Sequence, residues 1–555
     1  MSPITRNKKR KYVSEFDETY HSPSSLKNYI LDDPVLDFLK KKYGNTAKDN
    51  MSSVDFILEE GNKFETDIIS ELYNKSSFPR QIYKISNYDK ENKLDHYETT
   101  KKLIEDKIYD VILNGLLIND TNCTYGYPDL IVKGSWILKT IETNLEINII
   151  PSIYYIIDIK SSTINLINNE YGKKVGNKKL YKMYKSQIYI YMKALEQIQK
   201  VNINYGFILG KSYSNTKNNK INKEHNPFKT LGVIDFNNEN TDYDELITKS
   251  INWKNNLNKN WHLWDETIPS VKELYPNMKN KYDYPYKKIK KDIALNLKEI
   301  TLLWNCGLKH RNHAFDNNIF SYDHPKLNSK VMDITKSSAK IIDNIIDVNR
   351  NNKIISIPKD NNMLNWRKVI KKELYVDFET YNYDNKNILY MIGIGEYTDK
   401  WNFKCLYIGD GKCNNEYMLL NEFINYIKSF RNYRLIHWSN AEPSIINKKI
   451  KEYNITFNDF KWFDLLKVFK YKNSPIVIKD AFNFSLKEIT KALNKNKLLN
   501  LEWCDLDDGL TSLLIARDIY TGKLNFNENM KQIIDYNEID CKAMFELLQL
   551  IRNKK

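Results

Sequence analysis

Apolar positions in the first half of the chain follow two alternating spacings. Around residues 64–72 they recur every four residues, and over 180–199 they recur every three or four residues, and this spacing predicts amphipathic helices. Over 130–132 and 153–159 they form short runs rich in β-branched and aromatic residues, which predict strands, and 203–209 predicts one more. The order helix, strands, helix, strand predicts a mixed α/β domain in this part of the chain.

The second half of the chain carries a different series of elements. Residues 215–245 are rich in Asn, Lys and Asp, which predicts a loop or a small boundary, and 246–365 predicts mostly helices joined by loops. A second α/β pattern then begins at Glu373. Its strands are expected at 374–378, 389–394 and 434–438, and its helices at 417–430, 486–493, 511–520 and 530–551.

The chain is too long for one hydrophobic core. At 555 residues it exceeds the usual size of a single domain, and its hydrophobic fraction of 41% is sufficient for several folded units. We therefore expect an α/β multidomain protein with four segments. These are a basic flexible arm at 1–30, a first α/β domain at 31–235, a mostly helical connecting region at 236–365 and a second α/β domain at 366–555.

The chain is strongly basic. Lys and Arg total 85 against 70 acidic residues, so the net charge is +15, and the resulting positive field favours polyanionic partners such as nucleic acid. An AT-rich genome, which places Lys, Asn, Ile and Tyr in many proteins, explains the same composition, so the charge alone does not identify a partner. The basic run 6–11 has similar alternatives: an import signal, a nucleic-acid tether or a solvated tail.

Several classes of protein are not indicated by the sequence. The six cysteines are scattered without a CxxC pair or the spacing of a zinc or iron–sulfur site, which favours a reducing compartment. The sequence contains no GxxxxGK[ST] phosphate loop, so it gives no indication of an ATP site. The chain starts without an apolar leader, and no apolar run reaches the ~18 residues of a membrane helix. We expect an intracellular protein that is not embedded in a membrane.

Two predicted strands carry acidic residues beside a lysine. Asp129 directly precedes the first strand, and Asp158 and Lys160 lie two apart on the second, so their side chains share one face. If the two strands pair, Asp129 joins them. Two adjacent carboxylates suit Mg²⁺ or Mn²⁺, which can hold phosphate oxygens and lower the pKa of a bound water. Lys160 can orient or deprotonate that water and offset the charge of the transition state.

Three helical residues extend this constellation. Glu65 lies on the first predicted helix and can complete a metal shell from the side. Gln187 and Tyr191 lie one turn apart on the next predicted helix and can steady Lys160, the attacking water or a phosphate. A cationic stretch around the start of that helix is expected where DNA enters. Its lysines are Lys173, Lys174, Lys178, Lys179, Lys182 and Lys185.

Together these motifs resemble those of RecB-like PD-(D/E)XK nucleases, including the CRISPR-associated RecB-like group. In chain order they are Glu65, Gly126-Tyr127-Pro128-Asp129, Asp158-Ile159-Lys160-Ser161-Ser162 and Gln187-x-x-x-Tyr191, within about residues 50–210. The resemblance implies a restriction-endonuclease-like core with a mixed sheet, dependence on Mg²⁺ or Mn²⁺ and DNA as the substrate. Several relatives carry a cysteine-ligated iron–sulfur cluster. Because no group of cysteines flanks this segment, we expect none here.

The second α/β segment carries its own acidic residues. Asp377 and Glu379 lie two apart on a predicted strand, and such a pair suits two metal ions about 3.5–4 Å apart. Tyr536 and Asp540 lie four apart on a predicted helix and share one face. The carboxylates between these two pairs are Glu442 and Asp464.

This order resembles RNase H-like three-prime to five-prime exonucleases of the DEDD type, and specifically the YprB-like branch that is often joined to RecB-like nucleases. The similarity covers about residues 370–551, includes Ser485-Leu486-Lys487 ahead of a helix, and implies Asp377, Glu379 and Asp540 as metal ligands. Glu442 stands where the common pattern has Asp. That leaves open whether Glu442 or Asp464 completes the site, and whether this domain cuts nucleic acid or only clamps it.

Joined proteins of this kind occur in prokaryotes and in giant DNA viruses, and the bias toward Asn, Ile, Lys and Tyr suggests a mimivirus-type member. The leading hypothesis is a metal-dependent nuclease that hydrolyses DNA, as an exonuclease in repair, recombination, replication or defence, mainly through its first domain. RNA is a second candidate substrate, and a separate helicase and a homo-oligomer are candidate partners.

Two alternatives to this hypothesis stay open. One is a catalytically silent nucleic-acid-binding scaffold that recruits a helicase, and the other is an RNase H-like exonuclease that acts mainly through its C-terminal domain. Candidate locations are the host cytoplasm or a virus factory for a viral protein, and the nucleus.

Overall fold

The chain divides into two compact units in the computed structural model. The N-terminal unit comprises Met1–Pro276 and Asn280–Lys291, and the C-terminal unit comprises Asn277–Lys279 and Asp292–Lys555. The structure describes residues 19–44, 52–75, 81–85, 93–143, 145–169, 172–217, 220–351, 353–383, 386–411, 413–472, 474–503 and 509–554.

Two of the expected segments differ from this division. The connecting region expected at 236–365 does not form a unit of its own, because its first part belongs to the N-terminal unit and its last part to the C-terminal unit. The expected arm at 1–30 ends in helix α2 (Pro23–Ile30), which Ser22 caps through its hydroxyl. The basic run 6–11 lies outside the described residues.

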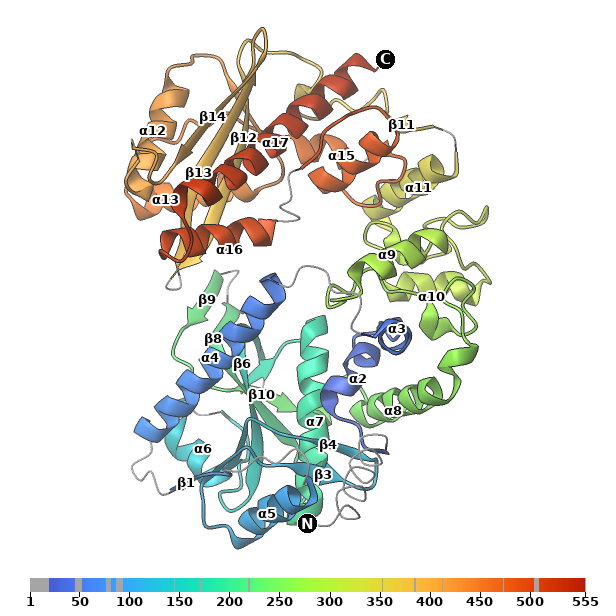
Figure 1. Ribbon diagram of the computed structural model, residues 1–555, viewed down its shortest axis with the longest axis vertical. Helices are drawn as coiled ribbons and strands as arrows, with labels where there is room; N and C mark the ends of the chain where they lie inside the picture. Colours follow the sequence, from blue (N-terminus) through green and yellow to red (C-terminus); the bar gives the residue numbers. More distant parts are fainter. Residues whose placement is uncertain are drawn as a thin grey trace, which may run out of the picture. The chain divides into compact units, whose positions relative to one another are not determined.

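The N-terminal unit is mixed α/β (Figure 1). Its other helices are α3 (Val35–Tyr43), α4 (Ser52–Lys75), α5 (Lys93–Asp106), α6 (Gly134–Thr140), α7 (Lys179–Gln199) and α8 (Tyr243–Asn260). Its strands are β1 (Ile82–Lys84), β2 (Val111–Leu113), β3 (Leu117–Asn119), β4 (Thr124–Gly126), β5 (Leu130–Lys133), β6 (Tyr154–Asn169), β7 (Gly172–Val175), β8 (Tyr205–Lys217), β9 (Lys220–Glu224) and β10 (Gly232–Asp235).

Eight of these strands form one sheet, in the order β1-β2-β5-β6-β7-β10-β8-β9, and β6 also pairs with β8. β5 runs antiparallel to β6, with Leu130 opposite Ile157, whereas β8 runs parallel to it, with Ile208 opposite Asp158. Residues 154–159 of β6 are all buried, and all of them except Asp158 are apolar or aromatic, which favours the centre of a sheet covered on both faces. Helices α4 and α7 both pack against β6.

Residues 215–245 are not the loop that their polar composition predicts. β8 and β9 form an antiparallel hairpin, and β10 lies between β7 and β8 in the sheet. All four residues of β10 are buried. The prediction was wrong here because four residues are too few to show the alternation of a strand.

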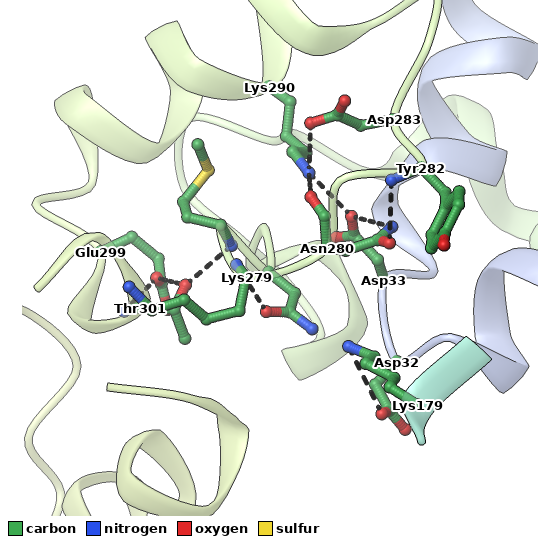
Figure 2. A network of polar contacts seen from close by, with 12 residues as sticks. Asp32, Asp33, Lys179, Lys279, Asn280, Tyr282, Asp283, Lys290, Glu299 and Thr301 are labelled. Atoms are coloured by element: carbon green, nitrogen blue, oxygen red, sulfur yellow. Dashed lines mark hydrogen bonds and ion pairs between the residues drawn. The ribbon is translucent and has the colours of Figure 1, made fainter. Parts of the chain in front are cut away.

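A buried ionic cluster joins the turn between α2 and α3 to residues 280–291 (Figure 2). Lys290 Nζ lies 3.0 Å from Asp33 Oδ2 and 2.7 Å from Asp283 Oδ2. Asn280 also donates a hydrogen bond to Asp33 Oδ2 at 2.9 Å. These contacts provide polar partners for the Lys290 ammonium, which is fully buried. Burial of this charge without such partners would destabilise the fold.

The C-terminal unit contains more helices and a separate sheet. Its helices are α10 (Leu308–Asp316), α11 (Lys336–Arg350), α12 (Glu416–Lys428), α13 (Ala441–Glu452), α14 (Leu465–Phe469), α15 (Leu486–Lys495), α16 (Gly509–Tyr520) and α17 (Phe526–Asn553), while α9 (Lys287–Asn296) begins in the N-terminal unit. Its strands are β11 (Ile355–Ser356), β12 (Glu373–Tyr383), β13 (Lys386–Tyr397), β14 (Trp401–Tyr407), β15 (Arg434–His437), β16 (Trp462–Asp464) and β17 (Val477–Ile478).

Five strands form the main sheet of this unit, in the order β14-β13-β12-β15-β16. β12 pairs antiparallel with β13 and parallel with β15. Leu374 and Val376 of β12 pack with Leu419 and Phe423 of α12 on one face. Because side chains alternate along a strand, the odd-numbered residues of β12 lie on the other face, where α16 and α17 contact the strand (Figure 1).

The strands and helices expected in this unit are confirmed, with boundaries shifted by a few residues. The structure adds β14, α13, β16, α14 and β17 between them. In the described part of the chain, no helix combines the length and the apolar character needed to cross a membrane.

Candidate active sites in the two units

The first acidic cluster forms where β5 and β6 lie side by side in the N-terminal unit. Asp129 directly precedes β5, and Asp158 and Lys160 lie on β6. The pairing of the two strands brings Asp129 to Ile159, whose backbone N–H donates to Asp129 Oδ2 at 2.6 Å. The structure therefore brings Asp129 together with Asp158 and Lys160.

Asp158 and Lys160 form an ion pair. The Asp158 side chain has no exposed surface, whereas that of Lys160 is 18% exposed. Lys160 Nζ contacts Asp158 Oδ2 and lies 5.0 Å from the ring centroid of Tyr184 on α7. Burial lowers the pKa of Lys160, but the charges of Asp158 and Asp129 outweigh that effect, so the net shift is upward. The ammonium group therefore keeps its proton at neutral pH.

Helix α7 supplies the two predicted residues that support this pair. Gln187 Nε2 donates to Asp158 Oδ1 at 3.0 Å and to the Tyr191 hydroxyl oxygen at 3.2 Å. Burial raises the pKa of Tyr191, and the charge of Asp158 raises it further, so the phenol stays neutral. Gln187 thus fixes one oxygen of the Asp158 carboxylate.

Glu65 on α4 belongs to the same electrostatic group. Burial raises the pKa of Glu65, and the charge of Asp158 adds to that shift while Lys160 opposes it. Burial also raises the pKa of Asp129 well above its ordinary value, again with Asp158 adding and Lys160 opposing. The negative charge of Asp158 therefore raises the pKa of both Glu65 and Asp129.

The donor set of this cluster suits a hard divalent cation. Asp158 Oδ2 is buried and accepts no hydrogen bond, although the Lys160 ammonium contacts it. Carboxylate oxygens are the ligands that Mg²⁺ and Mn²⁺ favour, so Glu65, Asp129 and Asp158 are the residues that would hold an ion. Within the described ranges, no three Asp, Glu, His or Cys side chains already lie at the spacing of a bound ion. The carboxylates would have to converge further to bind one.

Among the lysines expected to contact nucleic acid, Lys185 is a wrong prediction. Its side chain is 2% exposed, and its Nζ lies 2.8 Å from Glu239 Oε2 and 3.0 Å from Asn177 Oδ1. Lys185 lies on the stripe of α7 that faces the core, where its charge is offset by the Glu239 carboxylate.

The other lysines of this group differ in how far their charge is already neutralised. Lys174, Lys179 and Lys182 each form an ion pair with a carboxylate. Lys173 is half-buried and Lys178 is exposed. The positive charge available to a phosphate is therefore smaller than the sequence indicates.

The second acidic cluster lies between β12 and the helices α16 and α17. Asn537 on α17 donates to Asp377 Oδ2 at 2.6 Å, and Ser512 on α16 donates to Glu379 Oε2 at 3.2 Å. Gly393 of β13 lies opposite Asp377, and a Cβ atom there would lie 1.7 Å from Asn537 Oδ1. The glycine thus lets α17 approach the sheet closely enough to hold Asp377.

Asp540 lies one turn beyond Tyr536 on α17. Trp503 Nε1 donates to Asp540 Oδ1 at 2.9 Å. Lys487 Nζ lies 4.4 Å from the ring centroid of Tyr536 and 5.6 Å from that of Trp503. The positive charge of Lys487 lowers the pKa of both Asp540 and Glu379, which places this ammonium at the edge of the cluster.

The carboxyl groups of this second cluster oppose one another's ionisation. Burial and the charge of Asp540 raise the pKa of Glu379 to about 8. Burial raises the pKa of Asp540 to about 6. The pKa of Asp377 is raised well above its ordinary value by burial and by the charges of Asp540, Glu379 and Glu442. A divalent cation among these groups would offset the repulsion that their ionised forms share.

The two candidates for the fourth carboxylate have different surroundings. Glu442, in the first turn of α13, raises the pKa of Asp377, and its Oε2 lies 3.3 Å from His437 Nδ1. Asp464 instead caps α14, where its Oδ1 accepts a hydrogen bond from the Lys467 backbone N–H at 3.3 Å. The charge of Glu442 therefore acts on Asp377 and Asp540, whereas the Asp464 carboxylate caps a helix.

The sequence did not identify the side chains that hold the acidic groups in place. Trp503, Ser512 and Asn537 are donors to the second cluster, and each comes from a segment remote in sequence from β12 or from Asp540. No spacing rule marks such contacts. Lys487 was visible in the Ser485-Leu486-Lys487 segment, but the sequence did not assign it a role.

One comparison with known proteins finds a match, which lies in the C-terminal unit. A comparison with curated proteins finds no match. A protein-family model of the RNase_H superfamily matches residues 374–552, which include Asp377, Glu379, Glu442 and Asp540. Residues 374–552 therefore form an RNase H-like domain, and the second acidic cluster lies within it.

Proposed function

We propose that this protein is a divalent-metal-dependent nuclease that hydrolyses phosphodiester bonds in DNA. The observation that carries the proposal is the group of four carboxylates in the RNase H-like domain, Asp377, Glu379, Glu442 and Asp540, of which Glu379 and Glu442 are buried and the other two are half-buried. A polypeptide gains no stability by gathering carboxylates that repel one another at a site partly withdrawn from water, so their arrangement points to binding of a cation. An RNase H-like domain supports a nuclease of the metal-dependent type.

The side chains around this cluster have separate roles in the proposed reaction. A divalent ion bound there would lower the pKa of a water molecule and hold the scissile phosphate. Asn537 and Trp503 hold Asp377 and Asp540, and such outer contacts fix the orientation of ligands. Lys487 is placed to offset negative charge on a phosphate near Glu379 and Asp540.

We propose a second active site in the N-terminal unit, of the RecB-like PD-(D/E)XK type. The convergence of Asp129, Asp158, Lys160 and Gln187 supports it. The upward pKa shift of Lys160 favours an electrostatic role, because removing a proton from water would require a neutral amine. Lys160 would therefore stabilise the charge that develops on the phosphate.

DNA as the substrate is inferred from the net charge of +15 and from the RecB-like motifs. As an exonuclease in repair, recombination, replication or defence, the protein would act on strand ends. A separate helicase would be a suitable partner, since it would supply unpaired strands.

Cleavage assays on single-site variants test this proposal. End-labelled linear and circular DNA and RNA would be incubated with Mg²⁺ or Mn²⁺ and with wild type, Asp158→Asn, Asp377→Asn or the double variant. Asp459→Asn is the matched control, because Asp459 is an exposed carboxylate of the same unit whose partner is Lys461. We expect the double variant to lose at least about a hundredfold in rate, since even the outer partners of ligands contribute 10–100-fold. Wild-type cleavage by the double variant would contradict the proposal.

A further inference from the structure

A pocket of about 400 Å³ lies beside the first acidic cluster, within the N-terminal unit. It is enclosed by the start of α2, by β4 with the residue that follows it, and by α7. Gln187 lines the pocket and also donates to Asp158, so the pocket adjoins the proposed metal ligands. The pocket is therefore placed to hold part of a substrate whose reacting bond lies at this cluster.

The walls of the pocket are fixed by backbone contacts. The His21 N–H donates to the Cys123 carbonyl oxygen at 2.8 Å, and the Tyr125 N–H donates to the His21 carbonyl oxygen at 3.1 Å. These bonds attach the start of α2 to β4. Gly126 allows α7 to approach, because a Cβ atom there would lie 2.3 Å from Tyr191 Cε1. The pocket is thus preformed, as ligand sites usually are.

Lys27 gives the pocket a positive charge. Its side chain is partly buried, and burial lowers its pKa without an acidic group to oppose the shift. In the part of the chain that the structure describes, Lys27 forms no ion pair, and its Nζ lies 5.6 Å from the ring centroid of Tyr282. Burying an ammonium in part without a carboxylate is unfavourable, and an anionic ligand would remove that cost.

The other side chains that line the pocket can contact a flat ring and can form hydrogen bonds through a hydroxyl group. Tyr125 and Tyr127 offer aromatic surface, and Met183 offers a polarisable apolar one. Ser24 adds a hydroxyl group near Lys27. The volume is near the lower end of the ~300–1,000 Å³ range of ligand pockets, which suits one nucleotide better than a base pair.

We propose that this pocket binds one unpaired nucleotide of the DNA strand. Its phosphate lies at Lys27 and Ser24, and its base lies against Tyr125 and Tyr127. The neighbouring phosphodiester bond then reaches the first acidic cluster past Gln187. This proposal rests on the proposed nuclease activity of the N-terminal unit and adds to it a requirement for single-stranded DNA at that site.

Calorimetric titration of the full chain tests the pocket directly. dAMP and deoxyadenosine would be titrated in EDTA, which removes binding through divalent ions at either acidic cluster. We expect dAMP to bind at least about tenfold more tightly than deoxyadenosine, because a charge-assisted contact to the phosphate is worth that much or more. Lys27→Gln should abolish the difference. The matched control is Lys40→Gln, since Lys40 is an exposed lysine of α3, and it should leave the difference unchanged.

Equal binding of the two probes by wild type, or an unchanged preference in Lys27→Gln, would overturn the proposal. Inorganic phosphate that binds as tightly as dAMP would also overturn it, because the site would then not recognise a nucleotide. The test is separable from that of the proposed function. Loss of cleavage in the double variant without a dAMP preference refutes the pocket alone, and a dAMP preference with undiminished cleavage by that variant refutes the nuclease assignment alone.

Discussion

The carboxyl groups of Glu379 and Asp540 bind protons more tightly in the folded protein than in the unfolded chain. Their pKa values of about 8 and about 6 lie above the ordinary 4.5 and 3.8 of the two residue types. Between the ordinary and the folded values, the folded state holds more protons than the unfolded state. The free energy of unfolding therefore decreases as pH rises through this range.

This linkage predicts a pH-dependent effect of metal ions on stability. In EDTA, the melting temperature should fall between pH 5.5 and pH 8.5, because the cluster loses its protons and its charges repel. Adding Mn²⁺ should raise the melting temperature more at pH 8.5 than at pH 5.5, since protons compete with the ion for the same oxygens. Thermal melts of wild type and Asp377→Asn check this. A metal effect that is equal at both pH values, or unchanged in the variant, would contradict the assignment of these ligands.

Lys160 offers a second test at the residue scale. In an Asp377→Asn background, Lys160→Met should lower kcat about a hundredfold or more, because the charge on the phosphate loses its ammonium partner. Mn²⁺ affinity measured by calorimetry should remain close to that of the background, since Lys160 is not a metal ligand. Retained cleavage would assign Lys160 a purely structural role as the partner of Asp158.

At the scale of elements, Gly393 sets the distance between β13 and α17. A Cβ atom added at residue 393 would lie 1.7 Å from Asn537 Oδ1, so the Asn537 side chain would have to rotate. Asn537 is fully buried and has little room to do so. Gly393→Ala should therefore cost about 1–3 kcal/mol of stability by overpacking. It should also weaken metal binding about tenfold by releasing Asp377.

Two further variants separate these effects. Asn537→Ala should weaken metal binding to a similar degree without overpacking, and Gly307→Ala should change neither property, since nothing lies within 4 Å of a Cβ atom at residue 307. Calorimetry with Mn²⁺ and chemical unfolding provide the two measurements. Metal binding by Gly393→Ala at the wild-type level would show that Asn537 does not position Asp377.

For Asp464 we predict an effect on stability rather than on cleavage. Because it caps α14, Asp464→Ala should cost about 1 kcal/mol of stability, as loss of a helix cap usually does. Glu442→Gln should instead lower cleavage by the C-terminal domain with a smaller effect on stability. Thermal melts and cleavage assays of both variants in an Asp158→Asn background show which of the two residues is the fourth carboxylate of the cluster. A larger loss of cleavage in Asp464→Ala would favour Asp464 as the ligand.

The parts of the fold that the sequence predicted are those with a strong local pattern. The spacing over 180–199 is confirmed as α7, and the pair Asp158 and Lys160 lies on β6, because residues two apart on a strand share a face. β10 was missed because its four residues show no period. Contacts such as Asn537 with Asp377 could not be predicted, since they depend on how remote elements pack.

The helical periodicity of residues 180–199 already indicates that Lys185 faces the core. Lys185 lies four residues after Tyr181 and three before Ile188, on the buried stripe of α7. Helical periodicity alone therefore placed it on the core side rather than in a DNA path. A lysine at such a position needs a carboxylate partner, here Glu239, which only the structure identifies.

On the scale of the whole molecule, each unit carries its own acidic cluster on its own sheet. The N-terminal cluster lies at the pairing of β5 and β6, and the C-terminal cluster lies on β12 beneath α16 and α17. Residues 374–552 are RNase H-like, and nuclease activity is the property proposed for both units. If both sites act, the residual rates of Asp158→Asn and Asp377→Asn on the same DNA should sum to the wild-type rate.

Anomalous diffraction from crystals soaked in Mn²⁺ is the most direct test of the central claim, that the carboxylates of these two clusters bind divalent ions. We predict anomalous peaks within coordination distance of Asp377 and Asp540 in the C-terminal unit and of Asp129 and Asp158 in the N-terminal unit. We also predict that Asp377→Asn removes the first peak and leaves the second. Absence of a peak at both clusters, at a Mn²⁺ concentration that saturates cleavage, would contradict the account.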